Sequence, residues 1–198
     1  MAQKAGLTQK QIIDAAIAIA DAGGMEAVTL TSVAARLGVR PPSLYTHVDG
    51  IGGLHRAMAL VAGRDLIAFL RSAAGRGTGR HTLRAMAHAY RRFARQHPGC
   101  YAALLPRVGE QEDPQITAVV EEIVMLVGAA LVQEGIPAGE AMVVIRCLRS
   151  GVHGFVTLEA ERAFRFPLDA DESFEALVAT LVEGTLARYR PAAGSPPP

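Results

Sequence analysis

Apolar residues recur every three to four positions along almost the whole chain, whereas the strict alternation that marks a half-buried strand is nearly absent. These stripes predict one helix near the start, at residues 8–22, and five longer helices further on. The longer stripes cover residues 54–74, 80–96, 114–134, 137–162 and 172–190. The stripe at 137–162 is apolar almost all round, which is typical of a helix buried on several sides. The pattern therefore predicts an all-α fold.

Capping residues mark the ends of the first predicted helix. Thr8 is a favourable N-cap, and Gln11, three residues later, completes a capping box. Gly23 and Gly24 then end the helix, because glycine readily adopts the conformations that follow a helix C-terminus.

Two much shorter helices follow, separated by a tight turn. Thr29 is suited to cap the first of them, which Gly38 ends. Pro41 and Pro42 fit the first turn of the second, where a missing N–H costs nothing. Such a pair forms a helix-turn-helix, which needs the helix at 8–22 as a brace because short helices bury little surface alone. We expect the pair to share a core made of Val33, Leu37, Val39 and Leu44.

Several motifs in this region resemble the N-terminal domain of the tetracycline-repressor (TetR) family of bacterial transcription regulators. They are I-x-x-A-A at 12–16, Thr29 before the second helix, A-x-x-L-G-V at 34–39 and S-L-Y-T-H-V at 43–48. The resemblance is close over residues 8–60, and the helix count of the remainder matches the family's second domain. It implies an N-terminal three-helix helix-turn-helix DNA-binding domain at 1–53 and a larger helical ligand-binding and dimerisation domain at 54–190. The composition of the tail, 191–198, favours disorder.

The resemblance also assigns DNA-contacting residues. It implies that residues 41–47 form a recognition helix in the major groove, and hydroxyls, imidazoles and helix N-termini can all donate to phosphate oxygens. The implied contacts are Arg40, Pro42, Ser43 and Thr46 to base edges or adjacent phosphates, Tyr45 and His47 to phosphates, and Thr29 and Thr31 at the DNA backbone. The alternative is that Leu44 and Tyr45 are ordinary core residues and that His47 is a surface residue.

The chain departs from the family where a lysine often begins the fourth helix, because Ile51 stands there in the glycine-rich run at 49–53. Residues 1–50 hold four basic and four acidic side chains, so their formal charge is zero. Non-specific affinity grows with the number of phosphates that are neutralised. We therefore expect weak non-specific DNA binding with a shallow salt dependence. The two DNA-binding domains of a dimer would have to compensate for this weak binding.

Effector-binding residues are expected in the helical C-terminal part, where mostly apolar side chains with a few polar groups are typical of a small-molecule pocket. The candidates are Phe69, Met86, Tyr90, Phe93, Tyr101, Leu104, Met125, Cys147 and His153, and for each of them an ordinary core position is the alternative. The arginines of the helix at 80–96 lie opposite its apolar stripe. We expect them to form a solvated face, with an anion-binding face as the alternative.

The last two predicted helices are the most apolar, and the resemblance implies that they form a four-helix interface with a second copy. Gly151 and Gly154 permit close helix approach there, although the same helices can also pack inside one subunit. Around them, His153-Gly154 matches a subgroup named for a Trp–His–Gly pattern. Arg149 stands where its tryptophan is expected.

Composition narrows the remaining function classes. The 198 residues carry a net charge of +1 and two cysteines without a paired framework, and the start lacks the apolar segment of a signal peptide. The longest unbroken apolar run is shorter than a membrane span of about 20 residues. We expect a cytoplasmic protein with no membrane partner.

No metal-ligand pattern, phosphate loop or nucleophile elbow is present, so neither catalysis nor a metal or other cofactor is expected. The expected function is a homodimeric repressor that a small, mostly apolar molecule releases from a palindromic operator, by tilting the helix that begins at 54. The alternative is a helical ligand sensor that acts through a protein partner.

Overall fold

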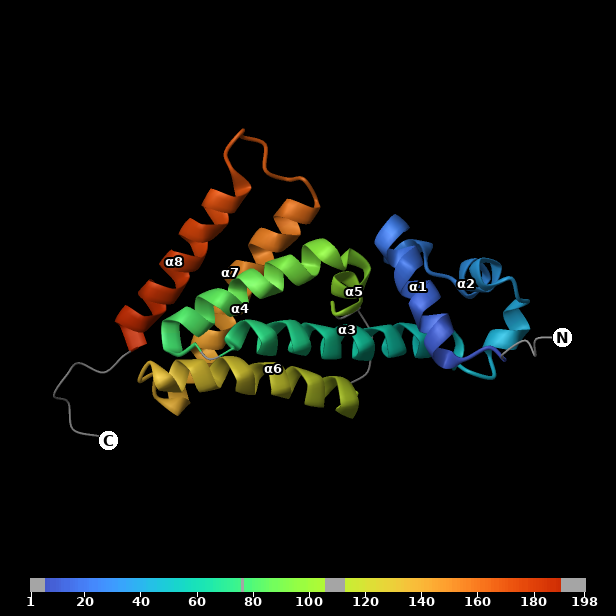
Figure 1. Ribbon diagram of the computed structural model, residues 1–198, viewed down its shortest axis with the longest axis horizontal. Coiled ribbons are helices and arrows are strands. Elements are labelled where there is room, and N and C mark those ends of the chain that lie inside the picture. The colour runs from blue at the N-terminus through green and yellow to red at the C-terminus, as the bar shows by residue number, and fades with distance from the viewer. Residues whose placement is uncertain (1–5, 76, 106–112, 190–198) are drawn as a thin grey trace. The chain divides into compact units, whose positions relative to one another are not determined.

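A computed structural model describes residues 6–75, 77–105 and 113–189, and every regular element in them is helical (Figure 1). The α-helices are α1 (Gln9–Gly23), α2 (Leu30–Leu37), α3 (Gly50–Ala74), α4 (Gly79–Gln96), α5 (Pro98–Ala103), α6 (Pro114–Gln133), α7 (Ala138–Ala160) and α8 (Ala170–Tyr189). Two single-turn 3₁₀ helices, η1 (Met25–Ala27) and η2 (Pro41–Leu44), complete the set. The predicted all-α fold is confirmed, and the tail at 191–198 lies outside the described residues.

The predicted capping of α1 is also confirmed. The Thr8 side chain accepts a hydrogen bond from the Gln11 N–H at 3.3 Å, and the Gln11 side chain accepts one from the Thr8 N–H at 2.9 Å. Gly24, with φ at 77°, follows the last residue. Local signals therefore fix both ends of this helix.

Contacts divide the described residues into two compact units. The first lies within Met1–Asp65 and Gln96–Val119, and the second within Leu66–Arg95 and Val120–Pro198. Helix α3 contributes residues to both units, as does α6. The functional boundary that we expect between residues 53 and 54 falls inside α3 and stays a prediction.

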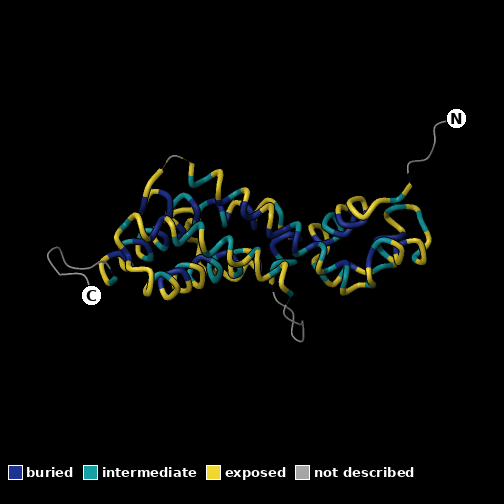
Figure 2. The backbone as a smooth tube through the Cα atoms, turned by 90° about the horizontal axis from the view of Figure 1, so that it is seen from below, coloured by how far each residue is buried: buried dark blue, intermediate teal, exposed yellow. Residues whose placement is uncertain are grey.

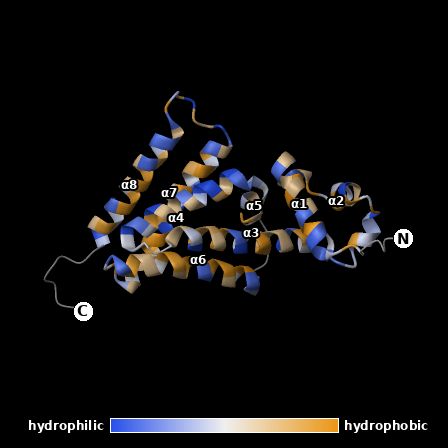
Figure 3. Cartoon of the chain, viewed as in Figure 1, coloured by the Kyte–Doolittle hydropathy of each residue, from blue (hydrophilic) through white to orange (hydrophobic). Residues whose placement is uncertain are grey.

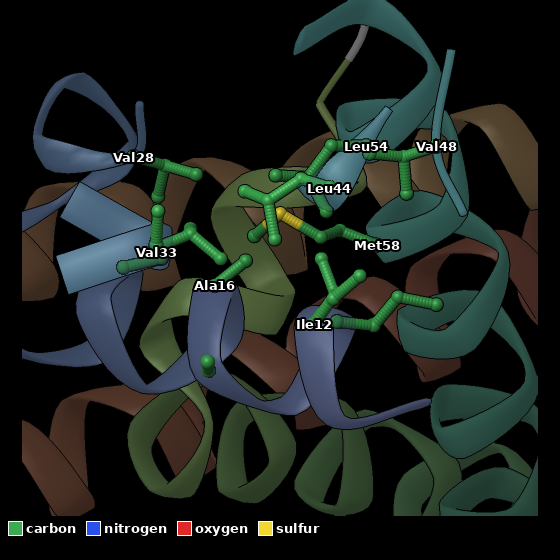
Figure 4. Packing of buried hydrophobic residues seen from close by; sticks show 12 residues of the cluster. Ile12, Ala16, Val28, Val33, Leu44, Val48, Leu54 and Met58 are labelled. Atoms are coloured by element: carbon green, nitrogen blue, oxygen red, sulfur yellow. The ribbon is translucent and has the colours of Figure 1, made fainter. Parts of the chain in front are cut away.

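The first unit has its core among α1, α2, η2 and the start of α3. Figure 4 shows side chains from these elements pointing toward one another. Ile12, Val33 and Leu44 have no exposed surface, and Leu54 and Met58 of α3 are equally buried. Leu44 is thus a core residue, as expected, and it holds η2 against α1 and α2.

The second unit buries less of its apolar surface than the sequence predicts. Helix α7 was expected to be buried on several sides, but within one chain its buried residues are only Val144, Ile145, Val152 and Val156. Intermediate and exposed residues lie between the buried ones of α7, as they do along the rest of the chain in Figure 2, and orange apolar residues run along much of α6 in Figure 3. The expectation is wrong for a single chain because α7 packs mainly on α8.

Among the residues that the structure describes, two helices are apolar enough to cross a membrane by length and composition alone. They are α6, with a mean hydropathy of 1.8 over its most apolar window, and α7, with 1.3. Neither helix contains an unbroken apolar run of about 20 residues. They still meet this criterion because a membrane span tolerates scattered polar residues. Core helices of soluble proteins pass the same test, but only 11% and 17% of these windows are buried within the chain. Both helices therefore present apolar surface that a single copy leaves uncovered.

Candidate nucleic-acid interface

Helix α2 begins at a second capping box. Thr29 Oγ1 accepts a hydrogen bond from the Ser32 N–H at 3.0 Å, and Ser32 Oγ accepts one from the Thr29 N–H at 3.0 Å. The hydroxyl of Thr29 is therefore engaged in holding the helix start, while the residue itself stays exposed. Thr31, in the first turn, is exposed as well.

The turn after α2 depends on one glycine. Gly38 has φ at 66° and ψ at 30°, in the left-handed region where a Cβ is unfavourable. Its N–H and that of Val39 donate to the carbonyls of Ala35 and Ala34, at 3.2 and 3.0 Å, so the end of α2 is closed. This geometry turns the chain back so that η2 packs on α2.

The recognition segment is shorter and tighter than the α-helix expected over residues 41–47. Pro41 and Pro42 lack N–H groups, and the Ser43 N–H donates to the Arg40 carbonyl at 2.9 Å in a 3₁₀ bond. After Leu44 the chain continues in turns, with the His47 N–H also bonded to the Leu44 carbonyl at 2.9 Å. The expectation of one α-helix over residues 41–47 is wrong, because the Ser43 N–H closes a 3₁₀ turn on the Arg40 carbonyl and the helix ends at Leu44.

This segment separates a buried side from an exposed one. Leu44 and Val48 point into the core, whereas Tyr45 is 61% exposed. The alternative that Tyr45 is an ordinary core residue is therefore wrong. Arg40, Pro42, Ser43 and Thr46 are exposed, and His47 is half-buried. The polar side chains of the segment are thus accessible, while Leu44 anchors it from below.

Positive charge is sparse around this segment. Lys10 is paired with Asp14 at 2.6 Å on the surface of α1. Among the described residues, Arg36 and Arg40 take part in no salt bridge. The first unit can thus offer two unpaired guanidinium groups near α2 and η2 for phosphates.

Helix α3 starts four residues earlier than expected, at Gly50. The Gly53 N–H donates to the Asp49 carbonyl at 2.9 Å, which closes the first turn despite the glycines. Ile51 is 40% exposed in this turn. The position at which the resembled family often carries lysine is therefore accessible here, and it is apolar.

A tight joint connects α5 to α1 within the first unit. The Gly99 N–H donates to Asp21 Oδ1 at 2.6 Å, so a carboxylate of α1 holds the first turn of α5. A Cβ at Gly99 would lie 2.7 Å from both the Ala20 Cβ and the Asp21 nitrogen. Beside it, burial and the charges of Asp21 and Asp65 raise the pKa of the Cys100 thiol to about 11. The joint is closely packed, and its thiol is protonated near neutral pH.

Replacing Gly99 with alanine is expected to lower the free energy of unfolding by about 1–3 kcal/mol, because overpacking a tight contact forces the backbone apart. Urea denaturation followed by circular dichroism measures this. Gly139→Ala in α7, where an added Cβ has no neighbour within 4 Å, is the matched control and is expected to be neutral or slightly stabilising. Equal stability of the two variants would contradict the tight joint.

The candidate effector residues are divided between the two units. Tyr101 and Leu104 belong to the first unit, and the other seven belong to the second. Met86, Phe93 and Tyr101 are buried, Phe69, Tyr90, Leu104 and His153 are half-buried, and Met125 and Cys147 are exposed. Phe69 and Phe93 meet edge to face with ring centroids 5.3 Å apart, and the Tyr90 hydroxyl lies 3.4 Å from His153 Nδ1. The set as a whole stays a prediction.

His153 of α7 is half-buried, and its surroundings disfavour the protonated form. Burial, and then the positive charge of Arg149, lower its pKa below 6.5. As the pH falls below about 6.5, the unfolded chain gains a proton at this site that the folded chain does not yet bind. Stability from this site is therefore present above pH 6.5 and is lost as the pH falls toward the lower folded-state pKa.

His153→Gln is thus expected to flatten the decrease in the free energy of unfolding between about pH 7 and pH 5. Urea titrations at half-unit pH steps measure that decrease for the variant and the wild-type chain. A variant that loses stability with acid as steeply as the wild type would show that His153 contributes nothing to it.

The arginine face of α4 is paired with carboxylates, although Arg80 and Arg95 remain exposed to solvent. Its guanidinium groups pair with carboxylates of α7, of α8 and of the residue that follows α6, all within the second unit. The pairs are Arg80 with Glu134 and Glu183, Arg84 with Glu175 and Glu183, Arg91 with Glu159 and Asp171, and Arg95 with Asp171. Arg91 is buried. The solvated face is thus present at Arg80 and Arg95 but not at Arg91, because acids distant in sequence fold back onto this face.

Within the residues described, no group of three or more His, Cys, Asp or Glu side chains is arranged to hold a metal ion. The chemistry that the first unit does offer is hydrogen bonding from hydroxyl, imidazole and guanidinium groups on an anchored, exposed segment. That is the chemistry of phosphate and base-edge recognition.

Comparisons with known proteins agree with this reading. The family model for bacterial regulatory proteins of the tetR family matches residues 12–58, and a model for the tetracyclin repressor-like C-terminal domain matches residues 83–181. The chain is 35% identical to the HTH-type transcriptional regulator YobS of Bacillus subtilis over 187 residues, which cover 94% of this chain and 96% of that one.

Two solved structures have the same fold. The putative regulatory protein SCO4313 has a TM-score of 0.73 and 25% identity, over 88% of this chain and 95% of its own. The TetR family protein ActR of Streptomyces coelicolor, in complex with (S)-DNPA, has a TM-score of 0.66 and 21% identity, over 93% and 99%. The architecture of a helix-turn-helix followed by a helical C-terminal part is shared by all of them.

Proposed function

The chain belongs to the tetR family of bacterial regulatory proteins, and from this we propose that it acts as a homodimeric repressor whose hold on a palindromic operator is released by a small, mostly apolar molecule. A ligand-responsive, DNA-binding transcription regulator is the function that the family and the fold support. The repressor mode, the operator symmetry and the dimer are our proposal.

The observation that carries the proposal is that η2 and the residues beside it have one buried side and one exposed side. Leu44 is fully buried, while its neighbour Tyr45 is 61% exposed among hydroxyl and guanidinium groups. We propose that Arg40, Pro42, Ser43 and Thr46 face base edges or adjacent phosphates, that Tyr45 and His47 bind phosphates, and that Thr29 and Thr31 meet the DNA backbone. Residues 1–53 then form the DNA-binding head, and residues 54–190 form the effector and dimerisation part.

The dimer is supported by the different surroundings of two glycines of α7. A Cβ at Gly151 would lie 2.5 Å from Leu181 Cδ1, so Gly151 serves the packing of α7 on α8 within one chain. Gly154 has no such neighbour within 4 Å. Met142 and Val143 of the same helix are exposed. A second copy covers this face in our proposal, which places the regulator in the cytoplasm rather than on a membrane.

The effector site is proposed in the second unit around Tyr90 and His153, whose polar atoms lie among apolar side chains. ActR, with a similar fold, holds (S)-DNPA. We further assign the chain to the subgroup with a Trp–His–Gly type C-terminal domain, on His153-Gly154 alone. Effector entry is proposed to tilt α3 and so to change the spacing of the two heads.

Replacing Ile51 with lysine is expected to raise DNA affinity and to steepen its salt dependence by about one unit of log Kd per log salt for each lysine added. The lysine adds a cation where α3 begins. Fluorescence anisotropy on labelled DNA at three salt concentrations measures both quantities, with Ile51→Gln as the uncharged control. Identical slopes for the two variants would place this turn away from the DNA.

Binding to DNA from the region upstream of the protein's own gene tests the proposed function. Purified wild-type protein is expected to bind specifically, with less affinity for random DNA of the same length, and to lose binding in Tyr45→Ala and His47→Ala. Absence of binding both to this DNA and to random genomic fragments, at two salt concentrations, would reject DNA as the partner. It would favour the ligand sensor that acts through a protein.

A further inference from the structure

The connection between α7 and α8 is the most exposed apolar feature of the second unit. Its nine residues, 161–169, here named the arm, are all exposed. Phe166 is 80% and Leu168 76% exposed, and Phe164 is 44% exposed. In Figure 1 the arm is the loop that joins α7 to α8 at the top of the view. Large apolar side chains at such exposure mark a surface that something else covers.

One buried cation holds both ends of the arm. The Arg91 side chain of α4 is only 7% exposed, and its guanidinium donates to both Glu159 oxygens, at 2.9 and 2.5 Å. It also lies 2.8 Å from Asp171 Oδ1. Glu159 is next to the last residue of α7, and Asp171 is the second residue of α8. The two points from which the arm departs are therefore fixed by the same side chain.

Aromatic packing and a helix cap fix the arm further. The Phe164 ring lies 4.8 Å from the Phe155 ring, which in turn lies under Arg91 at 5.4 Å. At the other end, Asp169 Oδ1 accepts hydrogen bonds from the Asp171 and Glu172 N–H groups at 2.7 and 3.3 Å. These contacts hold the arm in one conformation before it binds, which lowers the entropy cost of binding.

We propose that the arm seats on the second copy of this chain, so that Phe166 and Leu168 extend the dimer interface beyond α7 and α8. This inference rests on the homodimer of the proposed function. Nine of the twelve large apolar side chains that are exposed in the described residues belong to the second unit, the others being Tyr45, Ile51 and Leu105. Leu158, two residues before the end of α7, is also 45% exposed, so exposed apolar side chains continue from the arm onto α7.

Charge also favours a second copy as the occupant. Arg162 and Arg165 lie on the arm, and Glu161 and Glu172 lie at its two ends. None of the four forms a salt bridge with another residue that the structure describes. A two-fold interface brings the same patch of both copies together, so a patch with unpaired charges of both signs is complementary to itself. An apolar patch with charge of one sign would not be.

Sedimentation equilibrium of the wild-type chain and of the double variant Phe166→Ser, Leu168→Ser tests the arm. The variant is expected to dimerise about 10,000-fold more weakly, since a two-fold dimer loses both anchors from each copy and truncating each of the four costs about tenfold. When the variant and the wild-type chain are compared at equal fractions of monomer, their melting temperatures are expected to be the same, because both side chains are exposed in one chain. Ile51→Ser, which removes an exposed apolar side chain from the first unit, is the matched control.

Two further variants separate the arm from the dimer itself. Met142→Asp is expected to dissociate any dimer formed through α7, and a photo-crosslinking benzophenone amino acid at position 166 is expected to yield a covalent dimer. A wild-type chain that stays monomeric would overturn both the homodimer and the arm. A dimer that Met142→Asp dissociates, but that the double variant leaves intact, would overturn the arm alone.

Discussion

Replacing Tyr45 with alanine is expected to weaken operator binding by the dimer about 30- to 100-fold without loosening the head. In the proposed complex each copy loses one phosphate hydrogen bond of about 1–1.4 kcal/mol, so the dimer loses about 2–2.8 kcal/mol. Because Tyr45 is 61% exposed, its removal leaves no cavity in the core. Fluorescence anisotropy on the operator gives the affinity, and Tyr45→Phe isolates the hydroxyl from the ring.

Leu44→Ala is the matched control, one residue away. Leu44 has no exposed surface, so its truncation is expected to lower the free energy of unfolding by about 2–5 kcal/mol. Operator binding at low temperature, where the head is still folded, should then change less than in Tyr45→Ala. Wild-type affinity in Tyr45→Ala would remove this residue from the interface and would turn attention to Arg40 and Arg36.

Much of the head follows from signals that act over a few residues. The capping boxes at Thr8 and Thr29 and the left-handed Gly38 are local, so their spacing in the sequence already determines helix ends and the turn. The error at η2 concerns the type of helix. Pro41 and Pro42 fit the first turn of an α-helix and of a 3₁₀ helix alike, because the first N–H groups of either helix have no partner within it, so this signal does not determine which bonds follow.

The partners of the arginines were beyond the reach of the sequence pattern. A helical period sets Arg91 apart from the apolar stripe of α4. It does not say what faces that side. Glu159 is 68 residues further along the chain, and the pairing exists only because α7 passes α4 in the fold. The hydrogen bond between Asp21 and Gly99, which are 78 residues apart, could not be predicted for the same reason.

The candidate effector residues show a related limit. Apolar residue type and helical period select the inner face of a helix, and Met86 and Phe93 are indeed buried. Met125 fits the same pattern on α6, yet it is 74% exposed. A helix that is apolar on more than one side has no unique inner face, so its pattern cannot distinguish a pocket from a surface that meets another chain.

Removing the Arg91 side chain is the second change with a large expected effect. Arg91→Ala is expected to lower the free energy of unfolding by about 3–5 kcal/mol, because Glu159, whose side chain is 19% exposed, loses its partner in a poorly hydrated place. The guanidinium also lies 4.7 Å from the centroid of the Phe174 ring, so apolar packing is lost with the charge. For a chain of this length the melting temperature should fall by roughly 6–20 °C.

Arg95→Ala is the control for this change. Arg95 is 58% exposed and lies 3.4 Å from the same Asp171, so its ion pair is screened by water and its loss should cost less than about 1 kcal/mol. Scanning calorimetry and urea titration of both variants measure the difference. Arg91→Met separates the two causes, since it keeps an apolar stem between the rings and still leaves Glu159 unpaired. Equal losses in Arg91→Ala and Arg95→Ala would mean that burial adds nothing to the pair, and α7 and α8 would then be held to α4 by apolar packing alone.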